Sequence, residues 1–247
     1  LKQAVRWNLI PRNPVDGAEA PRPKRPELRT LTPDEVRKLL AFVEETPRFA
    51  LYALAVTTGL RRGELLGLRW DDIDLDRGRL TVRRTLQQVK GRGQIPLEPK
   101  TPRSRRTVAL SALAVEALRR HERLQEEASR QAGSAWQDTG TVFATSVGTP
   151  FEGGVVSRTF QSDLSTAGLP RVRFHDLRHT CATLLLEGDT NPKVVQEMLG
   201  HSTIVLTLDV YSHVLPHMQE RAATVFDRVL SEDARQPVAA SPGEGRG

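Results

Sequence analysis

The spacing of apolar residues changes twice along this chain, and these changes limit the folds that are open to it. Apolar residues recur at helical spacing up to about residue 68 and again beyond residue 111, whereas residues 79–110 hold short β-prone runs separated by glycines and prolines. This order predicts an α+β fold that is mainly α-helical, with a small, curved antiparallel β-sheet. At 247 residues, 38% of them hydrophobic, the chain can bury one large core.

Local start and stop signals place the individual elements. Thr32 is a good N-cap, Pro33 suits the first helical position and Glu35 completes a capping box, so a helix begins there. Further helices are predicted over residues 48–57, 61–68, 111–130, 154–167, 175–187, 192–199, 203–212 and 217–230. Short strands are predicted at residues 80–82, 85–86, 94–95 and 107–110.

The two ends of the chain differ from its middle. Residues 1–7 have the pattern of a helix end but no initiating methionine, which predicts a fragment cut inside a helix. Five prolines then crowd residues 8–30, as in an interdomain linker, and residues 231–247 are too polar and too rich in Gly and Pro to order themselves. We therefore expect a helix end plus linker over residues 1–30, a folded domain over 31–230 and a disordered tail.

Positive charge is concentrated in one stretch of the chain. The whole sequence carries 36 Lys and Arg against 30 Asp and Glu, a net charge of +6. Between Arg77 and Arg106 there are ten basic residues, and Glu98 is the one acidic residue. A run of charge is usually a solvated surface, but solubility alone would mix both signs. The run therefore favours a polyanionic partner, with a phosphate backbone as the natural match.

The composition also excludes some classes of protein. Cys181 is the only cysteine, so no disulfide can form within the chain. No apolar run reaches the ~18 to 20 residues that a membrane span needs. We expect a cytoplasmic protein without a membrane partner.

Two pairs of polar residues have helical spacing. Glu64 follows Arg61 by three positions, so its carboxylate can orient the Arg61 guanidinium and leave other N–H groups for phosphate oxygens. His175 and Arg178 have the same spacing and would share a helix face. A solvated surface pair worth ~0.3 kcal/mol is the commoner fate of such an Arg–Glu pair, so this motif is weak by itself.

Two more polar residues follow near the end of the folded region. Gly200 suits the left-handed cap of a helix end, and His201 comes directly after it. Tyr211 lies among apolar residues on the next predicted helix. Taken singly, His201 is an ordinary surface or packing residue and Tyr211 a core residue with a hydrogen-bonded hydroxyl.

A zinc site is the rival interpretation of the stretch from His175 to His179. Two His at i and i+4 with an acid after the first match the His-Glu-x-x-His pattern of zinc helices. However, Arg178 would place a positive charge beside the metal, and no third ligand stands out. His213 and His217 also offer only two ligands. His179 is better explained as a structural residue packed under its helix, and we expect neither a metal nor a cofactor.

Together the motifs are much more specific than each one alone. Five of them, in this order and spacing, resemble the conserved boxes of the tyrosine recombinase (phage integrase) family. They are Thr58-Gly59-Leu60-Arg61-Arg62-Gly63-Glu64-Leu65, Pro99-Lys100-Thr101, His175-Asp176-Leu177-Arg178-His179-Thr180, Leu199-Gly200-His201-Ser202 and Tyr211-Ser212-His213-Val214. The similarity covers roughly residues 32–230.

The resemblance implies the tyrosine recombinase catalytic fold and a reaction that needs no metal. Tyr211 would attack a scissile phosphate, forming a 3′-phosphotyrosyl link and a free 5′-hydroxyl. Lys100, on a β-hairpin, would protonate the departing 5′-oxygen. Because one ester replaces another, the reverse attack by a DNA hydroxyl would reseal the strand without ATP.

The same resemblance assigns the remaining polar groups. Arg61 and Arg178 would bind the non-bridging oxygens, where fixed guanidinium groups stabilise the charge that develops during transfer. His175 and His201 would donate hydrogen bonds to the phosphorane and assist proton movement. Glu64 would support Arg61 from behind.

The resemblance further implies a site-specific DNA recombinase or integrase that acts on mobile DNA as a homo-tetramer on double-stranded DNA. Residues 1–30 would then be the end of a missing N-terminal DNA-binding domain plus a linker, and residues 31–230 the catalytic domain. Six arginines are expected to contact DNA phosphates, namely Arg62, Arg83, Arg84, Arg103, Arg105 and Arg106.

Two other functions stay open. A catalytically silent remnant would bind DNA or protein without reacting, and an enzyme that relaxes DNA like a type IB topoisomerase would use the same chemistry. The complete set of Arg, Lys, His, Arg, His and Tyr favours an enzyme, because a remnant free to drift would lose a member of it.

Overall fold

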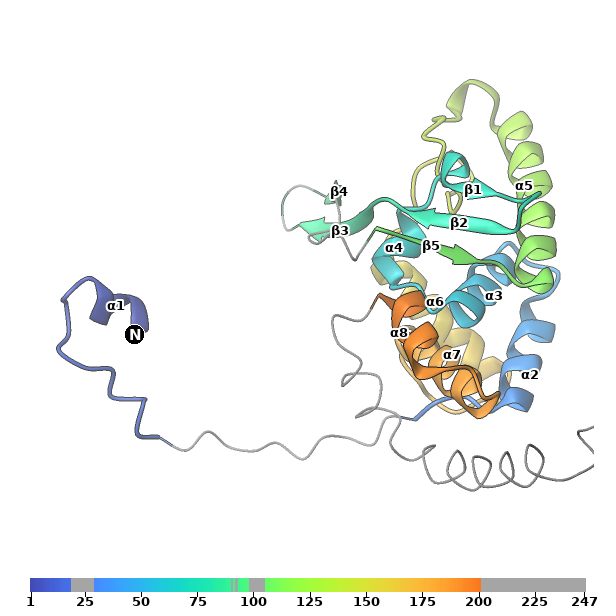
Figure 1. Cartoon of the computed structure of the whole chain (residues 1–247). Helices are drawn as coiled ribbons and strands as arrows, with labels where there is room; N and C mark the ends of the chain where they lie inside the picture. Colours follow the sequence, from blue (N-terminus) through green and yellow to red (C-terminus); the bar gives the residue numbers. More distant parts are fainter. Residues whose placement is uncertain (19–28, 90, 92, 98–104, 201–247) are drawn as a thin grey trace, which may run out of the picture.

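The computed structural model describes residues 1–18, 29–89, 91, 93–97 and 105–200 (Figure 1). The helices predicted over residues 203–212 and 217–230 lie outside these ranges. Residues 1–7 contain the short helix α1 (Lys2–Arg6), none of whose residues is buried. The remaining elements build a helical body with two small antiparallel sheets, which confirms the predicted α+β class.

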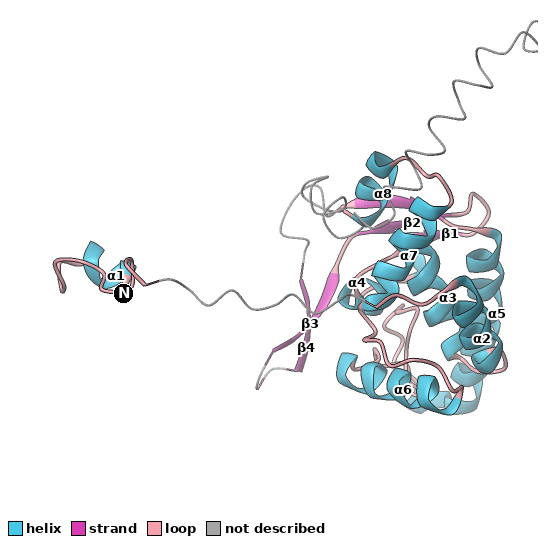
Figure 2. Ribbon diagram, turned by 90° about the horizontal axis from the view of Figure 1, so that it is seen from below, coloured by secondary structure: helices cyan, strands magenta, loops and turns pink. Residues whose placement is uncertain are grey.

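The helix α3 (Arg48–Thr58) lies at the centre of this body. It is apolar on nearly all sides, as a fully surrounded helix must be, and it contacts α2 (Pro33–Val43), α5 (Ala112–Ala132) and α7 (Asp176–Glu187). Figure 2 shows α3 enclosed by these helices. Helix α3 therefore ends inside the core, and its last residue, Thr58, begins the first motif.

The predicted start and stop signals act as expected. The Thr32 hydroxyl accepts from the main-chain N–H of Glu35, and the Glu35 carboxylate accepts from the N–H of Thr32, which completes the capping box of α2. The Ser111 side chain caps α5 by accepting from the main-chain N–H of Ala114. Gly59 and Gly200 end α3 and α8 (Pro192–Leu199) in the left-handed conformation, with φ of 61° and 67°.

Shorter elements complete the helical part. They are α4 (Arg62–Leu66), the 3-10 turns η1 (Trp70–Asp72) and η3 (Gly133–Ala135), and α6 (Gly153–Thr166). Phe174 precedes α7 and packs against Tyr52 of α3 and Phe160 of α6, with ring centroids 6.2 and 5.4 Å away. Phe174 thus buries the start of α7.

The predicted small antiparallel β region is present, but its strands form two sheets instead of one. The first sheet has the order β1 (Ile73–Asp74), β2 (Arg79–Val82), β5 (Arg106–Ala109). The second is the antiparallel hairpin of β3 (Thr85–Val89) and β4 (Gly93–Leu97). Each sheet is antiparallel throughout.

The chain leaves the first sheet at Arg83 and Arg84 because both side chains turn back to Asp72. Arg84 Nη1 lies 2.6 Å from Asp72 Oδ2, and Arg83 Nε lies 3.6 Å from Asp72 Oδ1. Strand β3 then packs on α4, where a Cβ at Gly63 would lie 2.5 Å from Thr85 Oγ1. Only glycine allows this approach, so the hairpin follows α4 rather than continuing β2.

No helix within the described ranges is both long and apolar enough to cross a membrane.

Candidate functional site

The first motif places Arg61 at the point where α3 gives way to α4. Arg61 is the N-cap residue of α4, and its main-chain N–H donates to Glu64 Oε2 at 2.9 Å. Its guanidinium Nη1 donates to Glu64 Oε1, also at 2.9 Å. The Glu64 carboxylate therefore orients both the backbone and the side chain of Arg61, as predicted, while 42% of the Arg61 side chain stays exposed.

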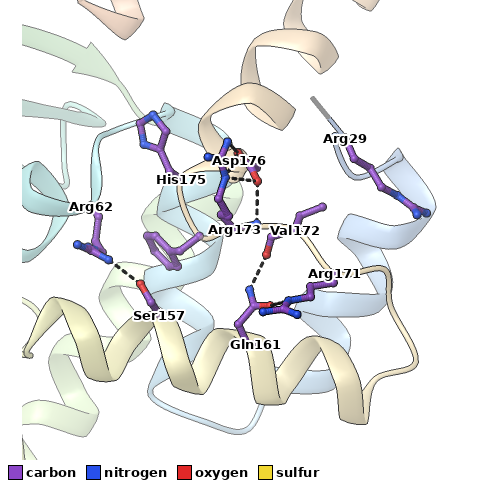
Figure 3. Close-up of a pocket in the computed structure, with 10 residues that line it drawn as sticks. Arg29, Arg62, Ser157, Gln161, Arg171, Val172, Arg173, His175 and Asp176 are labelled. Atoms are coloured by element: carbon purple, nitrogen blue, oxygen red, sulfur yellow. Dashed lines mark hydrogen bonds and ion pairs between the residues drawn. The ribbon is translucent and has the colours of Figure 1, made fainter. Parts of the chain in front are cut away.

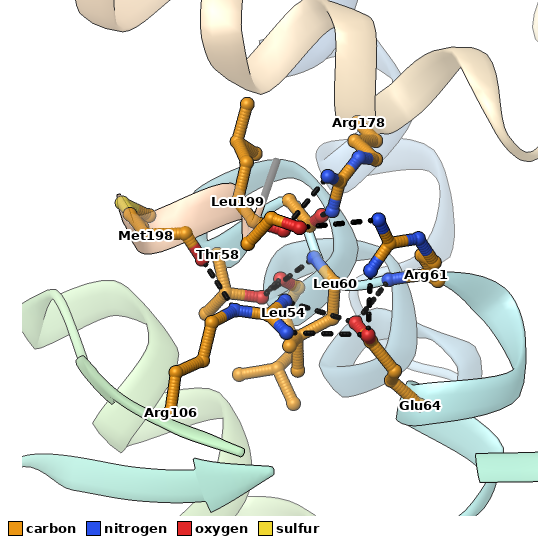
Figure 4. A network of polar contacts seen from close by, with 11 residues as sticks. Leu54, Thr58, Leu60, Arg61, Glu64, Arg106, Arg178, Met198 and Leu199 are labelled. Carbon is orange, nitrogen blue, oxygen red and sulfur yellow. Dashed lines mark hydrogen bonds and ion pairs between the residues drawn. The ribbon is translucent and has the colours of Figure 1, made fainter. Parts of the chain in front are cut away.

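The third motif brings Arg178 to the same place from α7. Arg178 is 3% exposed, and its Nη1 donates to the main-chain carbonyl of Gly59 at 2.7 Å. Its Nη2 donates to the carbonyl of Leu199, also at 2.7 Å. Arg61 Nη2 donates to the next carbonyl, that of Gly200, at 3.3 Å (Figure 4). Two guanidinium groups from distant motifs thus meet at the end of α8, directly before His201.

The end of α3 makes this convergence possible. A Cβ at Gly59 would lie 2.3 Å from Leu199 Cδ2 and 3.3 Å from Cys181 Sγ. The absence of a side chain at Gly59 lets α3, α7 and the end of α8 approach closely. Burial raises the pKa of the Cys181 thiol to about 12, against a small opposing effect of Arg178, so this thiol is a packing group.

The structure departs from the sequence prediction at Arg106. This residue was expected to contact a DNA phosphate, but its side chain is only 7% exposed and is directed inward. Its Nη1 and Nη2 donate to the two oxygens of Glu64 at 3.2 and 2.9 Å, and its Nε donates to the carbonyl of Met198 at 2.7 Å. Because the Arg106 guanidinium is buried and bonded to a carboxylate, it is not available at the surface for a DNA phosphate. The structure therefore contradicts the predicted DNA contact of Arg106.

Glu64 therefore holds two arginines. Burial by itself would raise the pKa of the Glu64 carboxyl, but the hydrogen bonds and charges of Arg106 and Arg61 outweigh burial, and the pKa lies below its ordinary value. The carboxyl is ionised at neutral pH, with both oxygens accepting from arginine N–H groups.

His175 and His179 lie side by side at the start of α7. Their ring centroids are 5.6 Å apart and the rings are nearly perpendicular. His179 thus faces His175 and is only partly buried, unlike the packed residue that was predicted, whereas Thr180 and Cys181 are buried in the core. Burial lowers the pKa of His175, and the neighbouring His179 and Arg178 lower it further, so the imidazole is neutral at pH 7.

Metal ligands are not gathered around this pair. Among the residues with described positions, no group of three or more His, Cys, Asp or Glu side chains is placed to hold a metal ion.

The predicted phosphate-binding arginines differ in how far they are available. Arg84 is only 24% exposed and is held by Asp72, so its charge is used inside the protein, contrary to its expected DNA contact. Arg83 is about half exposed although it also pairs with Asp72, and Arg105 is exposed. Arg62 is exposed and donates from Nη1 to Ser157 Oγ at 2.6 Å.

Sequence reasoning missed a basic cavity beside His175. The cavity has a volume of about 700 Å³ and lies between α6 and the segment leading into α7 (Figure 3). It is lined by Arg29, Arg62, Ser157, Gln161, Arg171, Val172, Arg173, Phe174, His175 and Asp176. The signal in the sequence was the pattern Arg171-Val172-Arg173 directly before the third motif, which places two cations on one side of a short extended segment.

Four of the predicted site residues lie outside the described ranges. They are Lys100, Arg103, His201 and Tyr211. The structure thus brings together Arg61, Glu64 and Arg178, with His175 at the start of the same helix as Arg178.

Relatives of this chain share its sequence pattern. Residues 29–218 match the phage integrase family. A XerC-like tyrosine recombinase of Caldanaerobacter subterraneus subsp. tengcongensis is 36% identical over 241 residues, which cover 91% of this chain and 62% of that protein. The ICEBs1 integrase of Bacillus subtilis is 28% identical over 229 residues, covering 92% and 62%. The chain therefore spans 62% of the length of these two curated relatives.

Solved structures share its fold. The Tn1549 transposon integrase in complex with transposon right end DNA superposes with a TM-score of 0.74 at 23% identity, covering 90% of this chain and 75% of that one. The XerA recombinase superposes with a TM-score of 0.63 at 24% identity, covering 82% and 66%. The fold is thus that of the tyrosine recombinase catalytic domain. With the family pattern matched over most of its length, the chain belongs to the phage integrase family.

Proposed function

We propose that this chain carries the catalytic domain of a site-specific tyrosine recombinase, which cuts and rejoins double-stranded DNA through a 3′-phosphotyrosyl intermediate. Family membership and the named tyrosine recombinases among its relatives support the proposal. The observation that carries it is the meeting of Arg61 and Arg178 at the carbonyls of Gly200 and Leu199. Two fixed cations beside the segment that leads to His201 and Tyr211 are what phosphoryl transfer without metal requires.

The guanidinium groups of Arg61 and Arg178 would have different roles in this reaction. Arg61 is partly exposed and its hydrogen bond to Gly200 is the longer one, so it can turn N–H groups toward a non-bridging oxygen. Arg178 is buried and held by two carbonyls at 2.7 Å, so it supplies a fixed positive charge behind the phosphate. Both charges would offset the negative charge that builds up on the transferred phosphoryl group.

Neutral His175 would interact with a scissile phosphate bound beside it. A neutral imidazole has one donor and one acceptor nitrogen, so it can hydrogen-bond to the phosphorane or take the proton of the Tyr211 hydroxyl. His201 would supply a second imidazole, and Lys100 would protonate the leaving 5′-oxygen. The phenol needs such help because its ordinary pKa near 10 keeps it protonated at neutral pH.

The basic cavity beside His175 would extend the DNA path. Arg62, Arg171 and Arg173 place three cations next to the proposed active site. Their N–H groups would donate hydrogen bonds to a phosphate next to the scissile one, and such backbone contacts do not depend on the DNA sequence. Arg83 and Arg105 would contact the backbone from the β region, together with Arg103.

We also propose how the domain assembles on DNA. The domain of residues 31–230 would act in a cytoplasmic homo-tetramer on DNA. The integrase and recombinase names of the relatives support a role in integrating or excising mobile DNA.

The decisive experiment looks for a covalent protein–DNA adduct. The protein is incubated in EDTA with 5′-labelled, nicked duplex DNA whose sequence is randomised, and the products are separated on a denaturing gel. A labelled adduct that disappears in Tyr211→Phe supports the proposal. No adduct despite salt-sensitive DNA binding would instead support the silent remnant. Relaxation of supercoiled plasmid without strand exchange would indicate the activity of a type IB topoisomerase.

A further inference from the structure

We infer that Arg106 is a positioning residue for the DNA cleavage site, an inference that rests on the proposed function. Arg106 opens strand β5 and follows, in the sequence, the segment that contains Lys100. Its guanidinium joins two other elements, because it donates to the Glu64 carboxylate of α4 and to the Met198 carbonyl of α8. Arg106 therefore ties the β region to both parts of the arginine site.

Three arginines together cap the end of α8. Its last carbonyls, those of Met198, Leu199 and Gly200, accept from Arg106, Arg178 and Arg61 in that order. The last carbonyls of a helix have no partner within the helix and form the negative end of its dipole, so guanidinium groups stabilise them. This arginine cap holds the backbone up to Gly200, which directly precedes His201 in the sequence.

Arg106 is much less able than Arg61 to contact DNA directly. Its side chain is 7% exposed, against 42% for Arg61, and both terminal nitrogens are already directed at Glu64. When Arg61 turns toward a phosphate, its hydrogen bond to Gly200 weakens, and Arg106 would keep the end of α8 and the Glu64 carboxylate in place. It would thus act on the reaction through Glu64 and α8 without touching DNA.

The neighbouring Arg105 provides a matched comparison. It has the same charge and an adjacent position, but its side chain is exposed. A positioning role for Arg106 predicts that the two substitutions affect different steps. Arg105→Gln would weaken DNA binding and reduce its dependence on salt, whereas Arg106→Gln would leave the dissociation constant within about threefold.

The test measures binding and single-turnover cleavage separately in Arg106→Gln, Arg106→Lys and Arg105→Gln, with Arg130→Gln of α5 as a surface control. We expect adduct formation at saturating DNA to fall about 100-fold or more in Arg106→Gln, the usual loss when a preorganised site is disturbed. Arg106→Lys should recover only part of that rate, because an ammonium keeps the charge but cannot fork onto both Glu64 oxygens. Wild-type cleavage in Arg106→Gln, or a loss confined to DNA affinity, would overturn the inference.

A readout without DNA separates this inference from the proposed function. NMR titration of Glu64 and amide exchange of residues 196–200 should show a higher Glu64 pKa and faster exchange in Arg106→Gln than in Arg105→Gln. Unchanged values would refute the positioning role. If wild-type protein gave no adduct but these changes were seen, the proposed recombinase activity would fail while the arginine cap would stand.

Discussion

Arg61 and Arg178 donate hydrogen bonds to adjacent main-chain carbonyls, those of Gly200 and Leu199, although they come from different helical segments. This relationship brings two positive charges to the same end of α8 before any DNA arrives. It also makes the end of α8 part of the site, because the carbonyls that hold both guanidinium groups directly precede His201.

Replacing either arginine by lysine should abolish most cleavage. Arg61→Lys and Arg178→Lys keep the charge but lose the planar fork, so the rate of adduct formation should fall about 100- to 1000-fold. Only Arg178→Lys should also lower the thermal midpoint, because the buried carbonyls of Gly59 and Leu199 lose a donor. Single-turnover kinetics and calorimetry check both effects, with Arg130→Lys as the control. An Arg178→Lys protein that cleaves normally would contradict the assignment.

Glu64→Gln should reduce stability in a manner that depends on pH. Removing this buried carboxylate leaves Arg106 facing a neutral amide, at a cost of roughly 3 kcal/mol in the free energy of unfolding at pH 7. The folded pKa of Glu64 lies below its ordinary value of 4.5. The carboxylate therefore stabilises the fold fully above pH 4.5, and this contribution is lost as pH falls through the folded pKa.

Urea unfolding of wild type and Glu64→Gln between pH 7 and pH 3 measures this effect. The difference in the free energy of unfolding should narrow below pH 4.5. A difference that stays constant over the whole range would mean that the charge of Glu64 does not contribute.

Cleavage should decline in acid because the proposed proton transfer from Tyr211 needs a neutral His175. Burial, His179 and Arg178 hold the pKa of His175 below 6.5, so protonation removes the acceptor nitrogen only as pH falls through that lowered pKa. His179→Gln removes the second of these causes, so the acid limb of the pH–rate profile should move to higher pH. Single-turnover rates between pH 5 and pH 8 provide the test, and coincident acid limbs in the two proteins would exclude His175 as the titrating group.

Gly200→Ala should be more damaging than a glycine substitution with the same backbone conformation elsewhere. At φ of 67°, an alanine costs ~1 to 2 kcal/mol, and its Cβ would lie 3.0 Å from Arg106 Nη1. Gly140 has a φ of 64°, but a Cβ there would make an ordinary contact at 3.9 Å with Arg69 Nε. Thermal unfolding should show the larger loss for Gly200→Ala, and equal losses would argue against close packing between Gly200 and Arg106.

Arg171→Gln should weaken DNA binding in proportion to one lost phosphate contact. Arg171 lines the basic cavity beside His175, where it donates to Gln161 at 3.2 Å. The slope of log K against log salt should decrease by about 1 relative to wild type. Fluorescence anisotropy with duplex DNA at several salt concentrations measures the slope, and Arg130→Gln serves as the control. An unchanged slope would show that Arg171 and its cavity do not contact DNA phosphates.

Features that depend on neighbouring residues were predictable from the sequence. The capping box of Thr32 and Glu35, the Arg61–Glu64 pair and the left-handed Gly200 all follow from spacing within a few positions. Such contacts are set by local geometry, which the sequence states directly.

Features that depend on tertiary packing were not predictable in the same way. Arg105 and Arg106 are indistinguishable in a basic run, and only strand β5 decides that one is exposed while the other reaches Glu64. The division of the β region arises from the hold of Asp72 on Arg83 and Arg84, which a list of β-prone residues does not reveal. Local patterns cannot specify such partners, because they are distant in the sequence.

The most direct test of the central claim is to identify the residue and the DNA end in the covalent adduct. Adducts formed in EDTA are digested with trypsin and nuclease, and the modified peptide is sequenced by mass spectrometry. We expect a nucleotide joined through its 3′-phosphate to the oxygen of Tyr211, and loss of this peptide in Arg61→Lys. Attachment to another residue, or through a 5′-phosphate, would contradict the proposed 3′-phosphotyrosyl intermediate.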